Sequence, residues 1–186
     1  MKKIMFDDRF GLTQAVLEGR KTMTRRIISE KLRERAYYCD SILEYLFRHS
    51  PYKVGEVVAV AQSYREIEKE IERDGLPLTL KDSILKTPGY RNKMFVKAEL
   101  MPHQIRFTAV HIERLHDISD EECVREGMSF VNGRFYVGFL KATGQRIWLD
   151  GDTPREAFAA LIDKVSGKGT WKSNRWVYVY EFELVK

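Results

Sequence analysis

The segment Val57-Val58-Ala59-Val60-Ala61 is a nearly continuous run of apolar residues, most of them β-branched. A short run of this kind is typical of a strand that is buried on both faces. Tyr52-Lys53-Val54-Gly55-Glu56 precedes it and predicts a turn that feeds the strand. We therefore expect residues 57–61 to form a central strand of a β-sheet.

Further strands are predicted where apolar and polar residues alternate. These segments are residues 21–28, 94–100, 105–115 and 176–185. Asn132-Gly133 supplies the two residues with positive φ that a type I′ hairpin turn needs, so a hairpin is predicted there. Residues 78–92 predict a long loop, and a loop of this length inside a compact domain is usually functional or mobile. The sequence thus predicts about five to seven strands.

Helices are predicted from capping residues and from apolar residues at helical spacing. The predicted helices cover residues 8–18, 29–48, 64–74, 119–126 and 153–166. Residues 64–74 are too polar for a core helix, so this helix is expected to be exposed. Strands and helices do not alternate regularly, which disfavours a doubly wound parallel sheet. The pattern instead favours an α+β fold, a small mixed β-barrel with flanking helices.

Length and composition are those of one globular domain, residues 1–186. Hydrophobic residues make up 44% and charged residues 32%, and no apolar run approaches the roughly 20 residues that span a bilayer. The chain begins with two lysines and then reaches Asp7, Asp8 and Arg9, so it lacks the apolar stretch of a signal peptide. We therefore expect a cytoplasmic protein that does not cross a membrane.

The cysteines and histidines do not form a recognisable site. Cys39 and Cys123 are far apart and neither belongs to a C-x-x-C pair, which argues against a disulfide framework and against a zinc site. His103, His111 and His116 do not have the spacing of metal ligands on a helix, and no role is assigned to them. The sequence predicts no metal and no cofactor.

Basic residues are concentrated in two stretches of a chain whose net charge is +5. Residues 20–35 contain seven basic and two acidic side chains, and residues 164–175 contain four basic side chains and no acid. If the two stretches meet in space, they form a positive surface that attracts phosphate groups. If they do not, they are two separate solvated faces. The sequence leaves both arrangements open.

The stretch Gly19-Arg20-Lys21-Thr22-Met23-Thr24-Arg25-Arg26 delivers a lysine, two threonines and three arginines from a glycine turn. A lysine that is desolvated beside other cations loses basicity and can take a proton from a threonine hydroxyl, while arginines hold a phosphate or a carboxylate. The same residues also suit an edge strand that is kept soluble by its charges. Strict alternation places Lys21 and Thr24 on opposite faces of a strand, so a shared site requires Lys21 to lie in the turn or the strand to be bulged.

Four segments of the chain carry longer patterns. They are G-R-K-T-x-T-R-R at residues 19–26, K-x-G-E-x-V-x-V at 53–60, I-E-R-L-x-D-I-S-x-E-x-x-x-x-E-G at 112–127 and W-x-x-N-x-W-V-x-V-Y-E-F at 171–182. Together, and in this order, they resemble the ASCH domain family, whose fold is PUA-like. The resemblance implies a β-barrel with a cleft that contains the first segment, and it implies RNA binding. Residues 29–50 and 64–92 would then be two insertions.

One branch of the family is an amidohydrolase that removes the acetyl group from N(4)-acetylcytidine with a Thr-Lys-Glu triad. For this chain the resemblance implies Lys21 as general base, Thr24 as nucleophile and Glu126 as proton donor. Amide cleavage needs all three of these roles. Glu122 lies on the same predicted helix as Glu126, but Ser119 and Glu122 already have the spacing of a capping box.

The predicted interface for a nucleic acid joins the first basic stretch to a corner near the C-terminus. Aromatic and basic residues interleave at this corner, as in proteins that stack on unpaired bases. The interface residues are Arg20, Arg25, Arg26, Lys168, Trp171, Lys172 and Arg175. Trp171 and Trp176 also suit a second role, as core anchors where a helix leads into a strand.

The leading hypothesis from the sequence is a domain that binds RNA or a modified nucleoside in a basic cleft. The alternatives are an amidohydrolase that deacetylates N(4)-acetylcytidine and a metal-independent ribonuclease. A binder should lose RNA affinity steeply as salt is added, whereas a nucleoside hydrolase should depend little on salt. The sequence does not indicate an oligomeric state.

Overall fold

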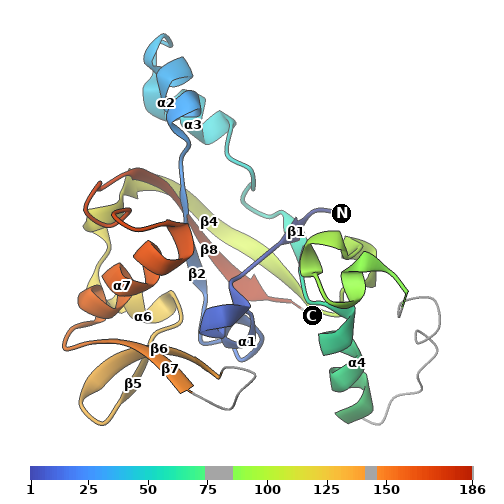
Figure 1. Ribbon diagram of the computed structural model, residues 1–186. Coiled ribbons are helices and arrows are strands. Elements are labelled where there is room, and N and C mark those ends of the chain that lie inside the picture. The colour runs from blue at the N-terminus through green and yellow to red at the C-terminus, as the bar shows by residue number, and fades with distance from the viewer. Residues whose placement is uncertain (74–85, 141–145, 186) are drawn as a thin grey trace. The chain divides into compact units, whose positions relative to one another are not determined.

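The computed structural model describes residues 1–73, 86–140 and 146–185 (Figure 1). Within these residues no helix is long and apolar enough to cross a membrane. The chain forms two compact units. The first comprises Met1–Phe6, Val57–Arg106 and Leu184–Lys186, and the second comprises Asp7–Glu56 and Phe107–Glu183. The first unit holds the predicted strand 57–61, and the second holds all the predicted site residues.

The first unit is built on the strand that the sequence predicts at residues 57–61. This strand, β3 (Val57–Val60), has a neighbour on each side, as a central strand requires. It is parallel to β1 (Lys3–Ile4) and antiparallel to the beginning of β4 (Gln104–Arg114). The predictions of a buried strand at 57–61 and of a strand at 105–115 are therefore confirmed.

Helix α4 (Tyr64–Arg73) follows β3 at the predicted place. Most of its charged residues face solvent, but Tyr64 and Ile67 are buried in a core cluster with Val96 and Met101. Burying two large apolar side chains stabilises the unit by about 3–6 kcal/mol. The helix is therefore exposed only on its polar side.

The predicted strand at residues 94–100 is wrong. Two 3₁₀ turns occupy the segment instead, η3 (Lys93–Phe95) and η4 (Ala98–Leu100). Between them the N–H of Lys97 donates to the hydroxyl of Tyr64 (2.9 Å) rather than to a neighbouring strand. Val96 and Ala98 are both buried, and their spacing of two residues imitates the alternation of a strand.

The predicted loop at residues 78–92 begins outside the described residues. Its described end contains the 3₁₀ turn η2 (Pro88–Tyr90). A Cβ at Gly89 would lie 2.6 Å from the ring of Tyr64, so only glycine fits there. The hydroxyl of Tyr90 donates to Glu68 (2.9 Å). This end of the loop is thus fastened to α4.

The second unit contains the rest of β4 and two further predicted strands. β2 (Met23–Ile27) pairs antiparallel with β8 (Trp176–Leu184). All the pairings together give the strand order β1-β3-β4-β8-β2. The structure is an α+β fold, as predicted, but the described strands form open sheets and do not close into the predicted barrel.

An aromatic cluster packs against one face of this sheet. The ring of Phe107 lies 4.7 Å from that of Tyr52 and 5.3 Å from that of Tyr180. Phe182 meets Phe107 edge to face at 6.4 Å. The hydroxyl of Tyr180 is satisfied by a 2.8 Å hydrogen bond with Ser50. The cluster therefore buries large rings without leaving this polar group unpaired.

A second sheet has three antiparallel strands. They are β5 (Ser129–Val131), β6 (Arg134–Leu140) and β7 (Arg146–Gly151). The turn between β5 and β6 is the predicted one, with φ of 51° at Asn132 and 82° at Gly133. Helix α7 (Pro154–Ser166) packs against β6 and β7, at the predicted place. The Asn132-Gly133 turn and the start of α7, both predicted from local sequence, therefore determine this part of the fold.

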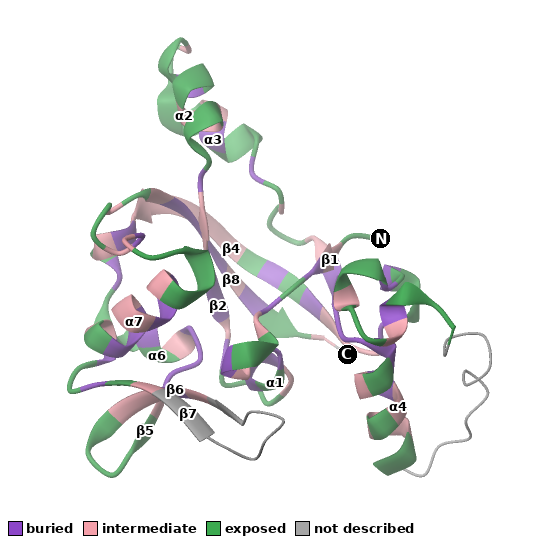
Figure 2. Cartoon of the chain, in the orientation of Figure 1, coloured by how far each residue is buried: buried purple, intermediate pink, exposed green. Residues whose placement is uncertain are grey.

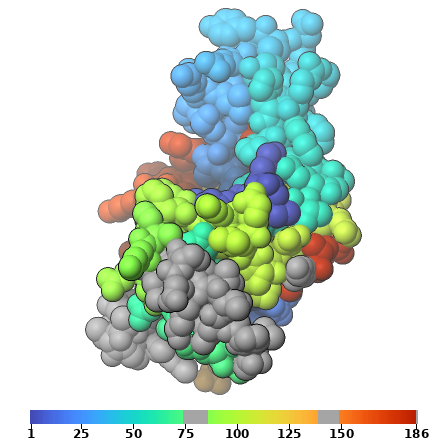
Figure 3. All heavy atoms as spheres, turned by 90° about the vertical axis from the view of Figure 1, so that its right-hand side faces the viewer, coloured from blue at the N-terminus to red at the C-terminus, as the bar shows by residue number. Residues whose placement is uncertain are grey.

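Residues 29–48 form two helices rather than the predicted single one. They are α2 (Glu30–Tyr37) and α3 (Ile42–Arg48). Ser41 interrupts the helix because its side chain caps a new one, accepting from the N–H of Glu44 (3.3 Å). Both helices are largely exposed, and Figures 2 and 3 show them side by side as one lobe. Tyr37 and Tyr38 at the turn are 75% and 87% exposed.

Removing the cap of α7 should destabilise the protein. The hydroxyl of Thr153 accepts from the N–H of Glu156, whose carboxylate accepts from the N–H of Thr153 in return. Thr153→Ala should lower the free energy of unfolding by about 1 kcal/mol, measured by urea titration. Ser166→Ala, at the exposed end of the same helix, is the control and should change it by less than about 0.5 kcal/mol. Equal effects of the two variants would contradict the capping role.

Candidate active site

Lys21 lies in the turn between helix α1 (Leu12–Leu17) and strand β2. Gly19 adopts a left-handed backbone (φ 71°), which glycine does without steric cost, and the chain reverses there. The N–H of Lys21 then donates to the carbonyl of Ala15 (2.9 Å). Because β2 begins only at Met23, Lys21 is not subject to the alternation of the strand. A site shared with Thr24 requires either that Lys21 lie in the turn or that the strand be bulged, and the structure has the first of these.

Glu126 meets Lys21 from the end of helix α6 (Asp120–Arg125). The amine Nζ of Lys21 donates to the carboxylate oxygen Oε2 of Glu126 (2.6 Å) and to its backbone carbonyl (2.8 Å). The two side chains are only 2% and 5% exposed. A buried ion pair of this kind is stable only when both charges keep their partners, since one alone costs several kcal/mol.

The buried position changes the acid–base behaviour of Lys21. Burial lowers the pKa of its amine because surroundings without water disfavour the charged form, and the negative charge of Glu126 opposes this shift. A neutral amine has two N–H groups and a lone pair. It can therefore keep both hydrogen bonds to Glu126 and still accept a proton, as a general base must.

Arg25 connects Glu126 to two further carboxylates. Its guanidinium donates to Oε1 of Glu113 (2.8 Å) and to Oε2 of Glu122 (2.9 Å), and it lies 3.3 Å from Oε1 of Glu126. The side chain of Arg25 is fully buried. Two cations, Lys21 and Arg25, thus face three carboxylates. Their charges are compensated inside the protein rather than presented to a phosphate.

Thr24 leaves the opposite face of β2 from Arg25. The pairing with β8 runs without a bulge and sets Thr24 opposite Tyr180, so Thr24 points to the face of the aromatic cluster. Thr24 is buried, and within the described residues no hydrogen bond joins its hydroxyl to Lys21 or Glu126. The structure thus joins two of the three residues of the predicted triad, and the role of Thr24 stays a prediction.

A pocket of about 410 Å³ lies beside the buried pair. It is lined by Asp8, Phe10, Gly11, Gln14, Arg20, Gly127, Ser129, Val131, Tyr136 and Gly138. Arg20 and Gly127 are the chain neighbours of Lys21 and Glu126. A Cβ on Gly127 would lie 3.5 Å from the Cβ of Lys21, so the stem of Lys21 packs directly behind this glycine, while Lys21 and Glu126 are not among the lining residues. The volume suits a small organic ligand such as a nucleoside.

The two basic stretches of the sequence meet at one end. The N–H of Ile28 donates to the carbonyl of Trp176 (3.0 Å), which brings the middle of the first stretch beside Arg175. Arg175 and Arg20 are exposed, whereas Arg26 is half-buried. Of the arginines predicted to contact a nucleic acid, Arg20 and Arg175 are therefore exposed, and Arg20 already donates two hydrogen bonds to Glu18.

The C-terminal corner presents its lysines but not the open face of a tryptophan. Lys168 and Lys172 are exposed. Trp171 is half-buried, with the ring of His116 at 4.4 Å and the guanidinium of Arg155 5.2 Å from its centre. Trp171 therefore acts mainly as an anchor of the corner, and the lysines remain as candidate contacts to phosphate.

Sequence reasoning missed the carboxylates that hold Arg25. The capping box predicted for Glu122 is confirmed, since its Oε2 accepts from the N–H of Ser119 (2.9 Å), but the same oxygen also accepts from Arg25. Glu113 is one polar residue of a predicted strand and carries no local signal. Arg25 was the one available signal for these carboxylates, because a guanidinium that becomes buried in the fold requires acidic partners.

In comparisons with known proteins, no protein-family model, no curated protein and no solved structure matches the chain. The resemblance to the ASCH domain family therefore rests on the four sequence segments alone. The geometry of Lys21, Glu126 and the adjoining pocket is the independent argument for a function.

Breaking the buried pair from one side should destabilise the protein strongly. Lys21→Met leaves the carboxylate of Glu126 buried with one cation fewer and should cost about 3–5 kcal/mol in unfolding free energy. The double variant Lys21→Met/Glu126→Leu removes both charges and should regain most of this loss. Urea titration of the two variants measures the difference. A single variant as stable as the double variant would show that the pair is not an energetic unit.

Proposed function

We propose that this chain is an ASCH-type, PUA-like domain that binds a modified nucleoside and hydrolyses the amide bond on its base. The observation that carries the proposal is the buried Lys21–Glu126 pair directly behind a pocket of nucleoside size. A buried lysine with a lowered pKa beside a pocket is typical of a catalytic site. The substrate, N(4)-acetylcytidine, follows from the resemblance to the amidohydrolase branch of the family.

The pair can supply both the base and the acid that amide cleavage needs. When the proton in the 2.6 Å bond moves from Nζ of Lys21 to Oε2 of Glu126, the ion pair becomes a neutral amine and a protonated carboxyl. Once the carboxyl has turned its proton away from Nζ and toward the substrate, the lone pair of the amine can take the proton of the nucleophile as it attacks the acyl carbon, and the carboxyl gives its proton to the departing N4 nitrogen. Lys21 and Glu126 are then charged again, so the original ion pair is restored.

Thr24 is the nucleophile that the resemblance implies. Its hydroxyl would form an ester with the acyl group and release cytidine, and water would then cleave the ester to acetate. This step requires the hydroxyl to come within hydrogen-bond reach of Nζ of Lys21. The amine of Lys21 can also take a proton from a water molecule, and that water would then be the nucleophile. The role of Thr24 is therefore tested separately.

The pocket favours a small substrate over a long phosphate backbone. The rings of Phe10 and Tyr136 line it and can pack against a nucleobase. Gln14 and Arg20 lie on its wall and can donate hydrogen bonds to a base or a ribose. Lys21 is neutralised by Glu126, so the buried pair adds no net charge that would select an anionic ligand.

The purified protein should release acetate and cytidine from N(4)-acetylcytidine, and chromatography of the reaction mixture measures the cytidine formed. Lys21→Met/Glu126→Leu should be folded and inactive, because it lacks both the base and the acid. Lys164→Ala, an exposed lysine of α7, is the control and should retain full turnover. Turnover by the folded double variant, or none by the wild-type protein, would overturn the proposal.

The rate of hydrolysis should fall as the pH is raised, and the fall should occur at a pH below 10.5, the ordinary pKa of a lysine. The active pair holds one shared proton, and raising the pH through the lowered pKa of Lys21 removes it. The amine then remains a base, but Glu126 has no proton for the leaving nitrogen. A pH–rate profile checks this, and a rate that keeps rising through pH 10.5 would exclude Glu126 as the proton donor.

Thr24→Val keeps the shape of the side chain and removes its hydroxyl. If Thr24 is the nucleophile, this variant should lose hydrolysis and Thr24→Ser should retain it. Turnover by each variant on N(4)-acetylcytidine is the measurement. Wild-type turnover by Thr24→Val would assign the attack to water activated by Lys21.

RNA binding is the second candidate, and the exposed Lys168, Lys172 and Arg175 favour it. Each phosphate contact that is lost should reduce the salt dependence of the affinity. A variant with all three changed to alanine should therefore bind single-stranded RNA more weakly and with a shallower salt slope. Affinity that does not change would exclude this corner, and shortened RNA would favour the ribonuclease alternative.

A further inference from the structure

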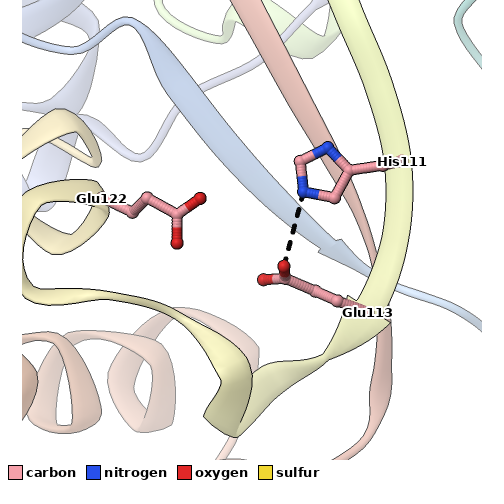
Figure 4. Close-up of side chains that lie close together, drawn as sticks. All are labelled: His111, Glu113 and Glu122. Atoms are coloured by element: carbon pink, nitrogen blue, oxygen red, sulfur yellow. Dashed lines mark ion pairs between the residues drawn. The ribbon is translucent and has the colours of Figure 1, made fainter.

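We propose that His111, Glu113 and Glu122 form a binding site for a divalent transition-metal ion, with zinc as the expected occupant. His111 and Glu113 extend from the same face of β4, and Glu122 faces them from α6 (Figure 4). Each residue offers one donor atom, and the three atoms all lie within 4.8 Å of one another. The site goes beyond the proposed hydrolysis, which uses no metal.

Two of the donors already have the spacing of ligands on one ion. Nε2 of His111 lies 3.4 Å from Oε2 of Glu113. Two ligands of a tetrahedral ion with bonds of about 2.1 Å are separated by about 3.4 Å. Glu122 is the third donor, within 4.8 Å of the other two, and it has to move closer to them to complete this geometry. An imidazole and two carboxylates leave further positions for water, as in catalytic zinc sites.

Arg25 holds the two carboxylates in place, and at Glu113 it does not use the oxygen that faces the histidine. Its guanidinium binds Oε1 of Glu113 and Oε2 of Glu122, while Oε2 of Glu113 is turned toward His111. The N–H of Ser119 also holds Oε2 of Glu122. Metal-binding carboxylates are commonly fixed by hydrogen bonds of this kind from outside the site. Glu113 is therefore oriented toward His111 before any ion arrives, and Glu122 is held close to both.

The charge of the cluster favours a cation. Lys21 and Arg25 supply two positive charges, and Glu113, Glu122 and Glu126 supply three negative ones. One negative charge remains unbalanced beside Arg25, where a divalent ion would offset it.

The three side chains are also accessible to an ion from solvent. His111 is 42% exposed, and the two glutamates are partly exposed, at 15% and 23%. Imidazole and carboxylate donors together suit zinc and its neighbours in the transition series rather than calcium or magnesium. This mixed donor set is the reason to choose zinc as the probe.

Isothermal titration of the full chain with zinc chloride, after dialysis against a chelator, tests the proposal. The wild-type protein should bind one equivalent. His111→Ala and Glu113→Gln should each weaken binding by about tenfold or more, since even loss of an outer partner of a metal site costs that much. His49→Ala, which removes an exposed histidine at the end of α3, is the matched control and should leave the affinity unchanged.

Two results would overturn the site. One is a wild-type protein that takes up no zinc. The other is zinc binding that persists unchanged in both His111→Ala and Glu113→Gln. Circular dichroism of each variant confirms its fold, and partly exposed His111 can be truncated without opening the core. Zinc uptake is read without substrate, so its outcome is independent of the hydrolysis experiments.

Discussion

Charge burial beneath helix α6 is the constraint on which the site depends. Lys21 comes from the turn after α1, Arg25 from β2, Glu113 from β4, and Glu122 and Glu126 from α6 and its end. Lys21, Arg25 and Glu126 are buried, and none of their charges can be left without a partner in surroundings that exclude water. The requirement therefore ties α6 and the turn after α1 to β2 and β4 through side chains, in addition to the backbone pairing that places β2 and β4 in one sheet.

The same cluster underlies both proposed chemistries of this region. On one side of Arg25 the pair of Lys21 and Glu126 shares a proton behind a pocket, which suits acid–base catalysis. On the other side Glu113 presents an oxygen to His111, which suits a metal ion. Arg25 lies between the two and binds carboxylates on both sides. Its loss would affect both, so it is a positioning residue for the whole region.

Local signals predicted much of the fold. Asn132-Gly133 forms the predicted hairpin turn and Thr153 caps the predicted helix, because both structures are set by residues a few positions apart. The predictions fail where a distant or competing contact decides. Residues 94–100 form 3₁₀ turns bonded to Tyr64 from α4, and Ser41 starts a second helix within a segment that reads as one.

The sequence by itself predicted a glycine turn beside Lys21 and a short helix that ends at Glu126, because both can be read from local patterns, and the resemblance to the ASCH domain family singled out these two residues as a proposed pair. It also determined the α+β class. Only the tertiary structure decided that Arg25 is buried among carboxylates and that Glu113 faces His111. The physical reason is that ion pairs and metal donors join residues far apart in the chain, and no local spacing records which of them meet.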